Sequence, residues 1–259
     1  VSGWYAPATN THRYAYAGRN FEYFSEDPLL AGAQVAEEIQ GAQAKGVYAF
    51  IKHFALNDQE TNRTHMLSTW TNEQALREVY LRPFEIGVKQ GGAHAVMSAF
   101  NYIGTTYAGA HPELLNTVLR EEWGFQGMVL TDYFAGYGYQ NADQIVRNGG
   151  DFMLATLDID IAKVNTQSDA GLAQMRRASH NILYTVANSW MYENGQPEVE
   201  RNTWEHITWV VAGALILALV GLEVVALRRY RARAAAGAES APPTRDTGEG
   251  DGTRGGGAE

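Results

Sequence analysis

An aspartate follows a short apolar run, at a position where a carboxylate can do chemistry. The run Met128 to Leu130 is bounded by Gly127 and stops abruptly at Thr131-Asp132. Such a run is typical of a buried parallel strand. Barrel enzymes carry their active residues at the carboxyl ends of strands. The alternative is that Asp132 only caps the following helix, and this stretch taken alone favours capping.

Two basic residues end another predicted strand. The segment Val47 to Phe54 has the pattern of a strand and includes Lys52 and His53 near its end. Packing gives a buried strand no reason to end in two basic residues, so we expect both side chains to point into a polar pocket. A cation beside Asp132 would favour the ionised carboxylate. The alternative is a structural ion-pair cluster around Asp132, because such clusters also perturb charged groups.

Strands and helices alternate along the chain. The expected strands are Trp4–Ala6, Val47–Phe54, Ala95–Phe100, Met128–Leu130 and Asp151–Leu154, and the expected helices run from Asp27 to Gly46, Asn72 to Gly87, Glu113 to Trp123, Asp143 to Asn148 and Leu172 to Trp190. This order predicts an α/β fold with a parallel sheet covered on both faces. An open doubly wound sheet and a closed barrel both fit. Polar residues cluster after the strands, which favours a TIM-type (β/α)8 barrel. Such a barrel needs about eight strands and roughly five are visible, so several are expected upstream of Val1.

The segment 206–227 is predicted to be a transmembrane helix. Ile207 to Leu227 is almost wholly apolar, with Glu223 near its far end, and the roughly 20 residues of a bilayer span fit within it. Arginines follow at 228–233, so the positive-inside rule places the tail in the cytoplasm. We expect a barrel domain over 1–192 outside the cell and a linker over 193–205. Over 228–259 we expect a basic juxtamembrane segment and, from Ala234, a disordered tail. The chain would then be a single-pass cell-membrane protein with the lipid bilayer as a partner.

Composition argues against several other classes. The formal net charge of -9 offers no basic face for nucleic acid. The absence of cysteine removes disulfides, zinc knuckles and thiol chemistry. His12, His65, His94 and His111 are scattered without ligand spacing, and no nucleotide fingerprint occurs, so we expect no metal and no cofactor. Richness in aromatic residues suits neutral, ring-shaped ligands such as sugars.

Four ordered stretches, GRNFEYFSEDP, KHFALNDQETNR, VMSAFN and GFQGMVLTDYF, resemble the catalytic barrel of family 3 glycoside hydrolases. The resemblance covers roughly Trp4 to Asn188, and the second stretch is similar to the β-glucosidase and β-xylosidase branch. By position, the resemblance implies that Asp132 is the catalytic nucleophile. It implies a substrate-binding set of Arg19, Lys52, His53, Met97 and Tyr133.

Two positions depart from the family pattern. Tyr133 stands where the family usually has a stacking Trp, and Phe100 stands where many members have a Tyr whose hydroxyl reaches the nucleophile. In the loop after Phe54, Glu60 and Arg63 are predicted to form a stiffening salt bridge, with ligand contact as the less favoured alternative. The sequon that starts at Asn62 lies in the same loop, and we expect it to stay unmodified.

The resemblance implies a retaining exo-β-glycosidase that acts on the non-reducing end of a β-glucoside or β-xyloside. The family usually takes its acid/base residue from a second α/β domain after the barrel. No sequence of that size follows here, so we expect this domain upstream, in the reversed order of some members, and expect this chain alone to be nearly inactive. The alternative is a catalytically idle, membrane-tethered sugar-binding protein. An open-sheet enzyme of another chemistry would need a nucleotide or metal motif.

Overall fold

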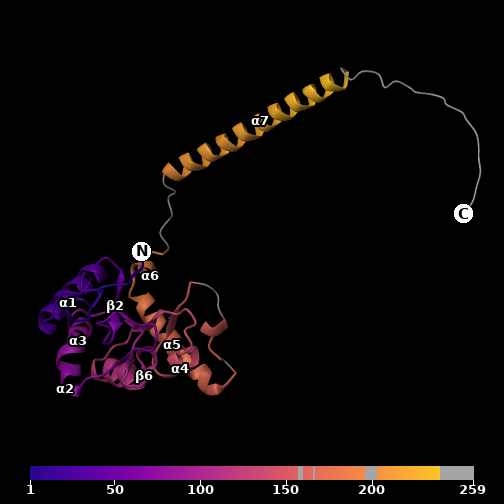
Figure 1. Ribbon diagram of the computed structural model, residues 1–259. Helices are drawn as coiled ribbons and strands as arrows, with labels where there is room; N and C mark the ends of the chain where they lie inside the picture. The colour runs from indigo at the N-terminus through magenta and orange to yellow at the C-terminus, as the bar shows by residue number, and fades with distance from the viewer. Residues whose placement is uncertain (157–159, 166, 196–202, 240–259) are drawn as a thin grey trace, which may run out of the picture. The chain divides into compact units, whose positions relative to one another are not determined.

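The computed structural model describes residues 1–156, 160–165, 167–195 and 203–239. The chain divides into two units, Val1–Pro197 and Glu198–Glu259 (Figure 1). The first unit carries the sheet and all the candidate site residues, and the second carries one long helix.

A curled parallel sheet forms the centre of the first unit. In spatial order its five strands are β1 (Gly3–Trp4), β2 (Tyr48–Phe54), β4 (Ala95–Ser98), β7 (Met128–Tyr133) and β8 (Phe152–Leu154). Every neighbouring pair is parallel, and Val96 registers with Ile51 on one side and Val129 on the other. The predicted α/β fold with a parallel sheet is confirmed as a half-barrel. Its completion to eight strands stays a prediction.

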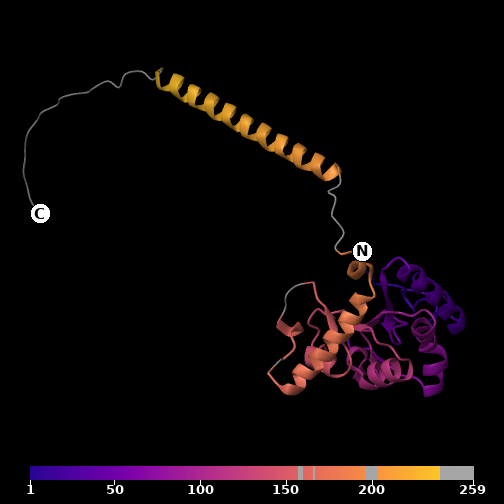
Figure 2. The same ribbon diagram turned by 180° about the vertical axis from the view of Figure 1, so that it is seen from behind.

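Helical segments alternate with the strands and pack on both faces of the sheet (Figures 1 and 2). They are α1 (Pro28–Gln43), α2 (Glu73–Ala75), η1 (Leu76–Tyr80), α3 (Arg82–Lys89), η2 (Ala108–Ala110), η3 (Glu113–Glu122), α4 (Ala142–Arg147), η4 (Asp160–Ala162), α5 (Asp169–Ala187) and α6 (Trp190–Asn194). The start of α1 was readable from sequence. The Asp27 carboxylate accepts the Leu29 amide at 2.8 Å, and Pro28 occupies the first helical position, where its missing N–H costs nothing.

The predicted helix from Asn72 to Gly87 is three segments in the structure. Asn72 caps α2 by accepting the Ala75 amide at 2.8 Å, η1 continues as a π-helix, and α3 begins at Arg82. Pro83 lies in the first turn of α3, where a proline is tolerated. The predicted helix is therefore interrupted just before Pro83.

The two faces of the sheet follow the alternation of side chains along each strand. Ile51, Val96 and Val129 belong to the larger core cluster, which includes residues of α1, α3 and η3. On the opposite face, Phe50, Met97 and Leu130 form a second cluster, against which Ile182 of α5 packs. Because alternate residues share a face, the second face continues along β2 to Lys52 and along β7 to Asp132. The alternation of side chains along the two strands thus places Lys52 and Asp132 on the same face of the sheet.

A small second sheet lies within the predicted polar loops. It pairs β3 (Ser68–Thr69), β5 (Tyr102–Ile103) and β6 (Thr106–Tyr107). Strands of two residues are too short to give an alternating pattern, so the sequence did not reveal them. The β5–β6 turn has Gly104 at φ +60°, a conformation that suits glycine.

The second unit contains α7 (Thr203–Glu239). Its stretch Thr203–Arg233 is long and apolar enough to cross a membrane, with a mean hydropathy of 2.6 in its most apolar window. The helix continues past the predicted end at Leu227 because the Ala- and Arg-rich residues that follow are strong helix formers. Residues 234–239, predicted as part of a disordered tail, are therefore helical. The rest of that predicted tail, 240–259, lies outside the described residues.

Candidate active site

The predicted site residues gather at the carboxyl ends of the strands. Asp132 is the next-to-last residue of β7, and Lys52 and His53 lie near the end of β2. Arg19 comes from the loop before α1 and reaches His53, with Nη1 3.1 Å from Nε2. The structure therefore brings Arg19, Lys52, His53 and Asp132 together.

The Asp132 carboxylate is nearly enclosed, with 10 % of its side chain exposed. Its Oδ1 accepts the Tyr133 amide at 2.7 Å, and its Oδ2 accepts from Arg63 Nη1 at 3.2 Å. His53 Nε2 lies 3.6 Å from Oδ2, which is too long for a hydrogen bond. Asp132 is thus held by one peptide N–H and one guanidinium.

Burial raises the pKa of Asp132 above its ordinary value, although Arg63, the Tyr133 amide and Arg19 each lower it. The direction matches a carboxylate taken out of water whose partners compensate only in part. Loss of any of these donors is therefore expected to raise the pKa further.

The His53 imidazole is neutral. Burial lowers its pKa well below the ordinary value, and the nearby charges of Arg19, Lys52 and Arg63 lower it further. A guanidinium can only donate hydrogen bonds, so Arg19 Nη1 donates to Nε2 and the ring proton sits on Nδ1. Asn10 fixes this peptide from the neighbouring loop: its Oδ1 accepts the His53 amide at 2.8 Å and its Nδ2 donates to the His53 carbonyl at 3.1 Å.

Glu22 forms ion pairs with two basic residues of the predicted set, Arg19 and Lys52. It pairs with Arg19, and its Oε2 lies 3.2 Å from Lys52 Nζ. Burial alone would raise the pKa of Glu22, but Arg19 and Lys52 outweigh it and lower the pKa. Glu22 therefore stays ionised and holds two cations that would otherwise repel each other.

Glu60 and Arg63 form the predicted salt bridge, with Arg63 Nε 2.8 Å from Glu60 Oε2. The same guanidinium also reaches Asp132 and lies over the Phe100 ring, 4.6 Å from its centroid. The cation–π contact helps to fix the guanidinium plane. Phe100 thus supports the donor to Asp132 through its ring, at the position where the family pattern has a hydroxyl.

The last two predicted residues occupy different surroundings. Met97 is buried on β4 and registers with Leu130, two residues before Asp132. Tyr133 is 40 % exposed, and its hydroxyl lies 3.0 Å from Thr156 Oγ1. The ring therefore stands at the open side of the site, next to the carboxylate.

Sequence reasoning missed two members of this cluster. Glu22 follows Arg19 at a spacing of three residues within GRNFE, and that spacing was an available indication of an ion pair. The contact between Arg63 and Asp132 joins residues 69 positions apart, so no local pattern could indicate it. Among the described residues, no group of three His, Cys, Asp or Glu side chains is placed to hold a metal ion.

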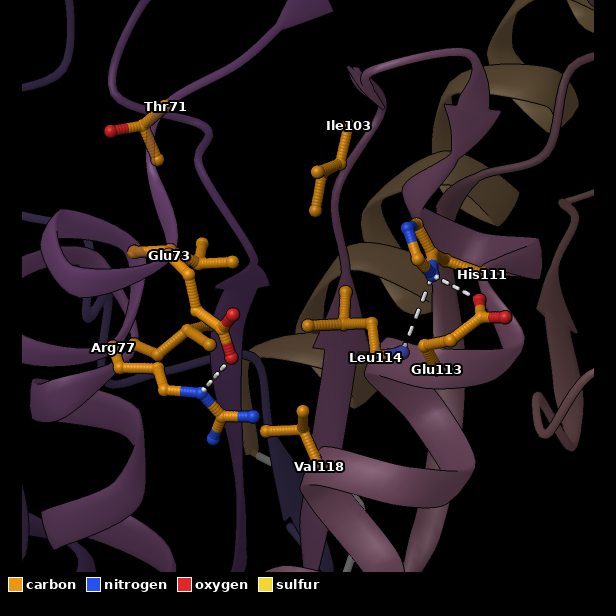
Figure 3. Close-up of a pocket in the computed structure, with 10 residues that line it drawn as sticks. Thr71, Glu73, Arg77, Ile103, His111, Glu113, Leu114 and Val118 are labelled. Atoms are coloured by element: carbon orange, nitrogen blue, oxygen red, sulfur yellow. Dashed lines mark hydrogen bonds and ion pairs between the residues drawn. The ribbon is translucent and has the colours of Figure 1, made fainter.

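A separate cavity of about 290 Å³ lies between the helices η1 and η3 (Figure 3). Leu76, Leu114 and Val118 line its interior. Polar side-chain pairs stand at its sides: Arg77 Nε lies 3.0 Å from Glu73 Oε1, and His111 Nδ1 lies 3.2 Å from Glu113 Oε2. None of the predicted site residues lines this cavity, so it is distinct from the Asp132 cluster.

Comparison with known proteins identifies relatives for the first unit. The profile of the glycosyl hydrolase family 3 N terminal domain matches residues 2–179. A β-glucosidase of Rhizobium radiobacter is 49 % identical over 132 residues, which are 51 % of this chain and 16 % of that protein. A β-glucosidase of Ruminococcus albus is 37 % identical over 189 residues, covering 68 % of this chain and 20 % of that protein.

Comparison with solved structures also finds β-glucosidases. The structure of β-glucosidase 3B from Thermotoga neapolitana in complex with glycerol matches with a TM-score of 0.67 and 37 % identity, over 80 % of this chain and 30 % of that one. A β-glucosidase structure from Kluyveromyces marxianus matches with a TM-score of 0.67 and 29 % identity, over 78 % and 25 %. The chain thus spans less than a third of each of these four proteins.

Proposed function

The chain belongs to glycosyl hydrolase family 3, and on that premise we propose that the full-length protein is a retaining exo-β-glycosidase. Its substrate is the non-reducing end of a β-linked glycoside. The relatives described above are β-glucosidases, which favours a β-glucoside over a β-xyloside. In this proposal Asp132 is the nucleophile, and Arg19, Lys52 and His53 hold the sugar hydroxyls.

The observation that carries the proposal is the environment of Asp132. A nucleophilic carboxylate must be ionised, oriented and shielded from bulk water. The Arg63 guanidinium and the Tyr133 amide hold Asp132 in one orientation, and the side chain is 10 % exposed. Arg19 and Lys52 provide N–H donors, and the neutral His53 ring beside them adds no charge to the site.

The mechanism follows from a carboxylate placed in this way. One Asp132 oxygen attacks the anomeric carbon as the glycosidic bond breaks, and the bond electrons leave with the aglycone oxygen, which takes a proton from an acid. Water then cleaves the resulting glycosyl ester, and two inversions give net retention. The carboxylate regains its negative charge, which Arg63 stabilises.

The acid is the part of this mechanism that the Asp132 cluster lacks. Glu22 is held ionised by Arg19 and Lys52, so it is unsuited to donate a proton. Glu60 is engaged by Arg63 at 2.8 Å. We propose that a second α/β domain of the full-length protein supplies the acid.

The direct test is Asp132→Asn in the full-length protein, assayed on an aryl β-glucoside and an aryl β-xyloside. The proposal expects wild-type hydrolysis of at least one substrate and a loss of about four orders of magnitude or more in the variant, because a neutral amide cannot replace the nucleophile. Near-normal hydrolysis by the variant would sink the assignment. Sugar binding by the wild type without turnover would favour the idle sugar-binding protein.

We further propose that α7 anchors the protein in the cell membrane with the catalytic unit outside. The apolar stretch Thr203–Arg233 and the arginines at 228–233 support this orientation. Protease added to intact cells should remove the catalytic unit and spare an epitope tag placed after Glu259. Protection of the catalytic unit would contradict the orientation.

A further inference from the structure

A tryptophan outside the Asp132 cluster is almost fully exposed. Trp70 follows β3 directly, and 85 % of its surface is accessible to solvent. A large aromatic side chain gains by burial, so an exposed indole on a rigid support offers a flat apolar face to a ligand.

The support under Trp70 is rigid. The Gly104 amide donates to the Thr69 carbonyl at 2.8 Å, and Ser68 Oγ donates to the Gly104 carbonyl at 2.7 Å. Thr69 Oγ1 donates to the Tyr102 carbonyl at 2.7 Å. These bonds tie the strand before Trp70 to the β5–β6 hairpin, so the indole is presented by a fixed backbone and little order is lost on binding.

A polar cavity of about 280 Å³, here named the Trp70 cavity, lies beside this ring. Its lining includes Arg13, Asp58, Gln59 and Ser68 in addition to the tryptophan. The volume is near the lower end of small-molecule sites, which suits one sugar-sized group. It is separate from the helix-lined cavity of Figure 3, although Thr71 lines both.

The polar groups of the cavity are of mixed type and balanced charge. Arg13 Nε lies 2.6 Å from Asp58 Oδ2, and Arg13 Nη2 donates to Gln59 Oε1 at 2.9 Å. Guanidinium donates, carboxylate accepts, and the Gln and Ser side chains can do both. Because the Arg13–Asp58 pair is neutral overall, the site selects neither an anion nor a cation. A ring that carries several hydroxyls and an apolar face fits the donors, acceptors and indole.

We propose that the Trp70 cavity is an accessory carbohydrate-binding site, which takes a pyranose ring of a β-linked glycan stacked on Trp70. The choice of a β-linked glycan rests on the proposed function, whereas the sugar-binding chemistry rests on the cavity alone. The loop that carries Asp58 and Gln59 continues to Arg63, whose guanidinium reaches Asp132. One loop thus borders both sites.

The test uses the full-length Asp132→Asn variant, which does not consume the glycan. Retention in gels that contain soluble mixed-linkage β-glucan, and calorimetry with cellotetraose, are compared with and without Trp70→Ala. The proposal expects Trp70→Ala to weaken glucan binding at least about tenfold, or ~1.4 kcal/mol. Trp70→Tyr should recover part of the loss because it restores an aromatic face. The matched control is Tyr192→Ala, which removes an aromatic ring that is 70 % exposed on α6, and it should leave retention unchanged.

Retention that is unchanged by Trp70→Ala overturns the accessory site. Iodide quenching of tryptophan fluorescence provides a second check, since Trp70→Phe should remove a quenchable component from the full-length protein. If it does not, another segment covers Trp70 and the proposal is wrong.

The two proposals can fail separately. Aryl glucoside hydrolysis by a wild type whose glucan binding ignores Trp70 keeps the proposed function and removes the accessory site. Trp70-dependent glucan binding by a wild type that hydrolyses no glycoside keeps the accessory site and removes the proposed function.

Discussion

Arg63 is the residue whose replacement tests the electrostatics of the site most sharply. Arg63→Met removes the charge and keeps much of the side-chain volume over Phe100. Asp132 then loses its guanidinium partner at 3.2 Å but keeps the Tyr133 amide. Because burial already raises the pKa of Asp132 and Arg63 is the largest group that lowers it, the variant should have a still higher pKa.

The magnitude follows from the contact that is lost. A hydrogen bond to a charged group contributes about 1.5–3 kcal/mol. The low end is expected here, because Arg63 is 21 % exposed and partly screened by water, and because Glu60 shares its guanidinium at 2.8 Å. At a pH on the acid limb of the rate profile, kcat/KM should fall roughly tenfold, with ~150-fold as the upper bound.

The assay is the pH dependence of kcat/KM for an aryl β-glucoside with the full-length protein. The unfavourable shift has a defined sign: the ionised carboxylate is the active form, so a raised pKa moves the acid limb towards higher pH. Arg63→Lys is the control, because it keeps the positive charge and should keep most of the limb position.

An acid limb that stays in place in Arg63→Met refutes this reasoning. A uniform loss of kcat/KM at every pH would mean that Arg63 acts on the substrate and not on the ionisation of Asp132.

Three further predictions concern other parts of the chain. Asp151→Ala should destabilise the first unit by about 3–5 kcal/mol, because the Arg120 guanidinium, which lies 2.7 Å from Asp151 Oδ2, would remain buried without its carboxylate. Urea unfolding measures the loss of stability, and a change below about 1 kcal/mol would be inconsistent with a buried pair. The folded state holds the pKa of His53 below its unfolded value, so the unfolded chain binds the extra proton and the free energy of unfolding should fall as pH drops below about 6.5. In His53→Gln this part of the decline should disappear. An unchanged dependence of stability on pH in the variant argues against a neutral buried imidazole. Deletion of 203–239 should release the protein from carbonate-washed membranes, and release of the intact protein by the same wash would contradict a spanning α7.

The main features of the sheet could be predicted because they have local causes. The run Met128 to Leu130 forms β7, and the alternation Phe50–Lys52 sets which face Lys52 shares with the second core cluster. The pairing of Asp27 with Pro28 marked the start of α1. Each of these patterns spans only a few residues, so propensity and periodicity suffice to find it.

The features that could not be predicted arise from distant parts of the chain. The two-residue strands that place Trp70 depend on backbone hydrogen bonds to a hairpin more than 30 residues away, such as the Gly104 amide to the Thr69 carbonyl. The Arg63–Asp132 contact spans 69 residues. The family resemblance identified Asp132, Lys52 and His53 as site residues. The structure was needed to show that Glu22 pairs with Lys52 and that Arg63 pairs with Asp132.

The central claim is that Asp132 attacks the anomeric carbon. Incubation of the full-length protein with a 2-deoxy-2-fluoro-β-glucoside that carries a good leaving group should trap the glycosyl ester, since the fluorine slows its hydrolysis. Mass spectrometry of the digested protein should then find the fluorosugar on the peptide that contains Asp132, and no label in Asp132→Asn. A fluorosugar found on another carboxylate, or turnover of an aryl β-glucoside with inversion at the anomeric carbon, would contradict the claim.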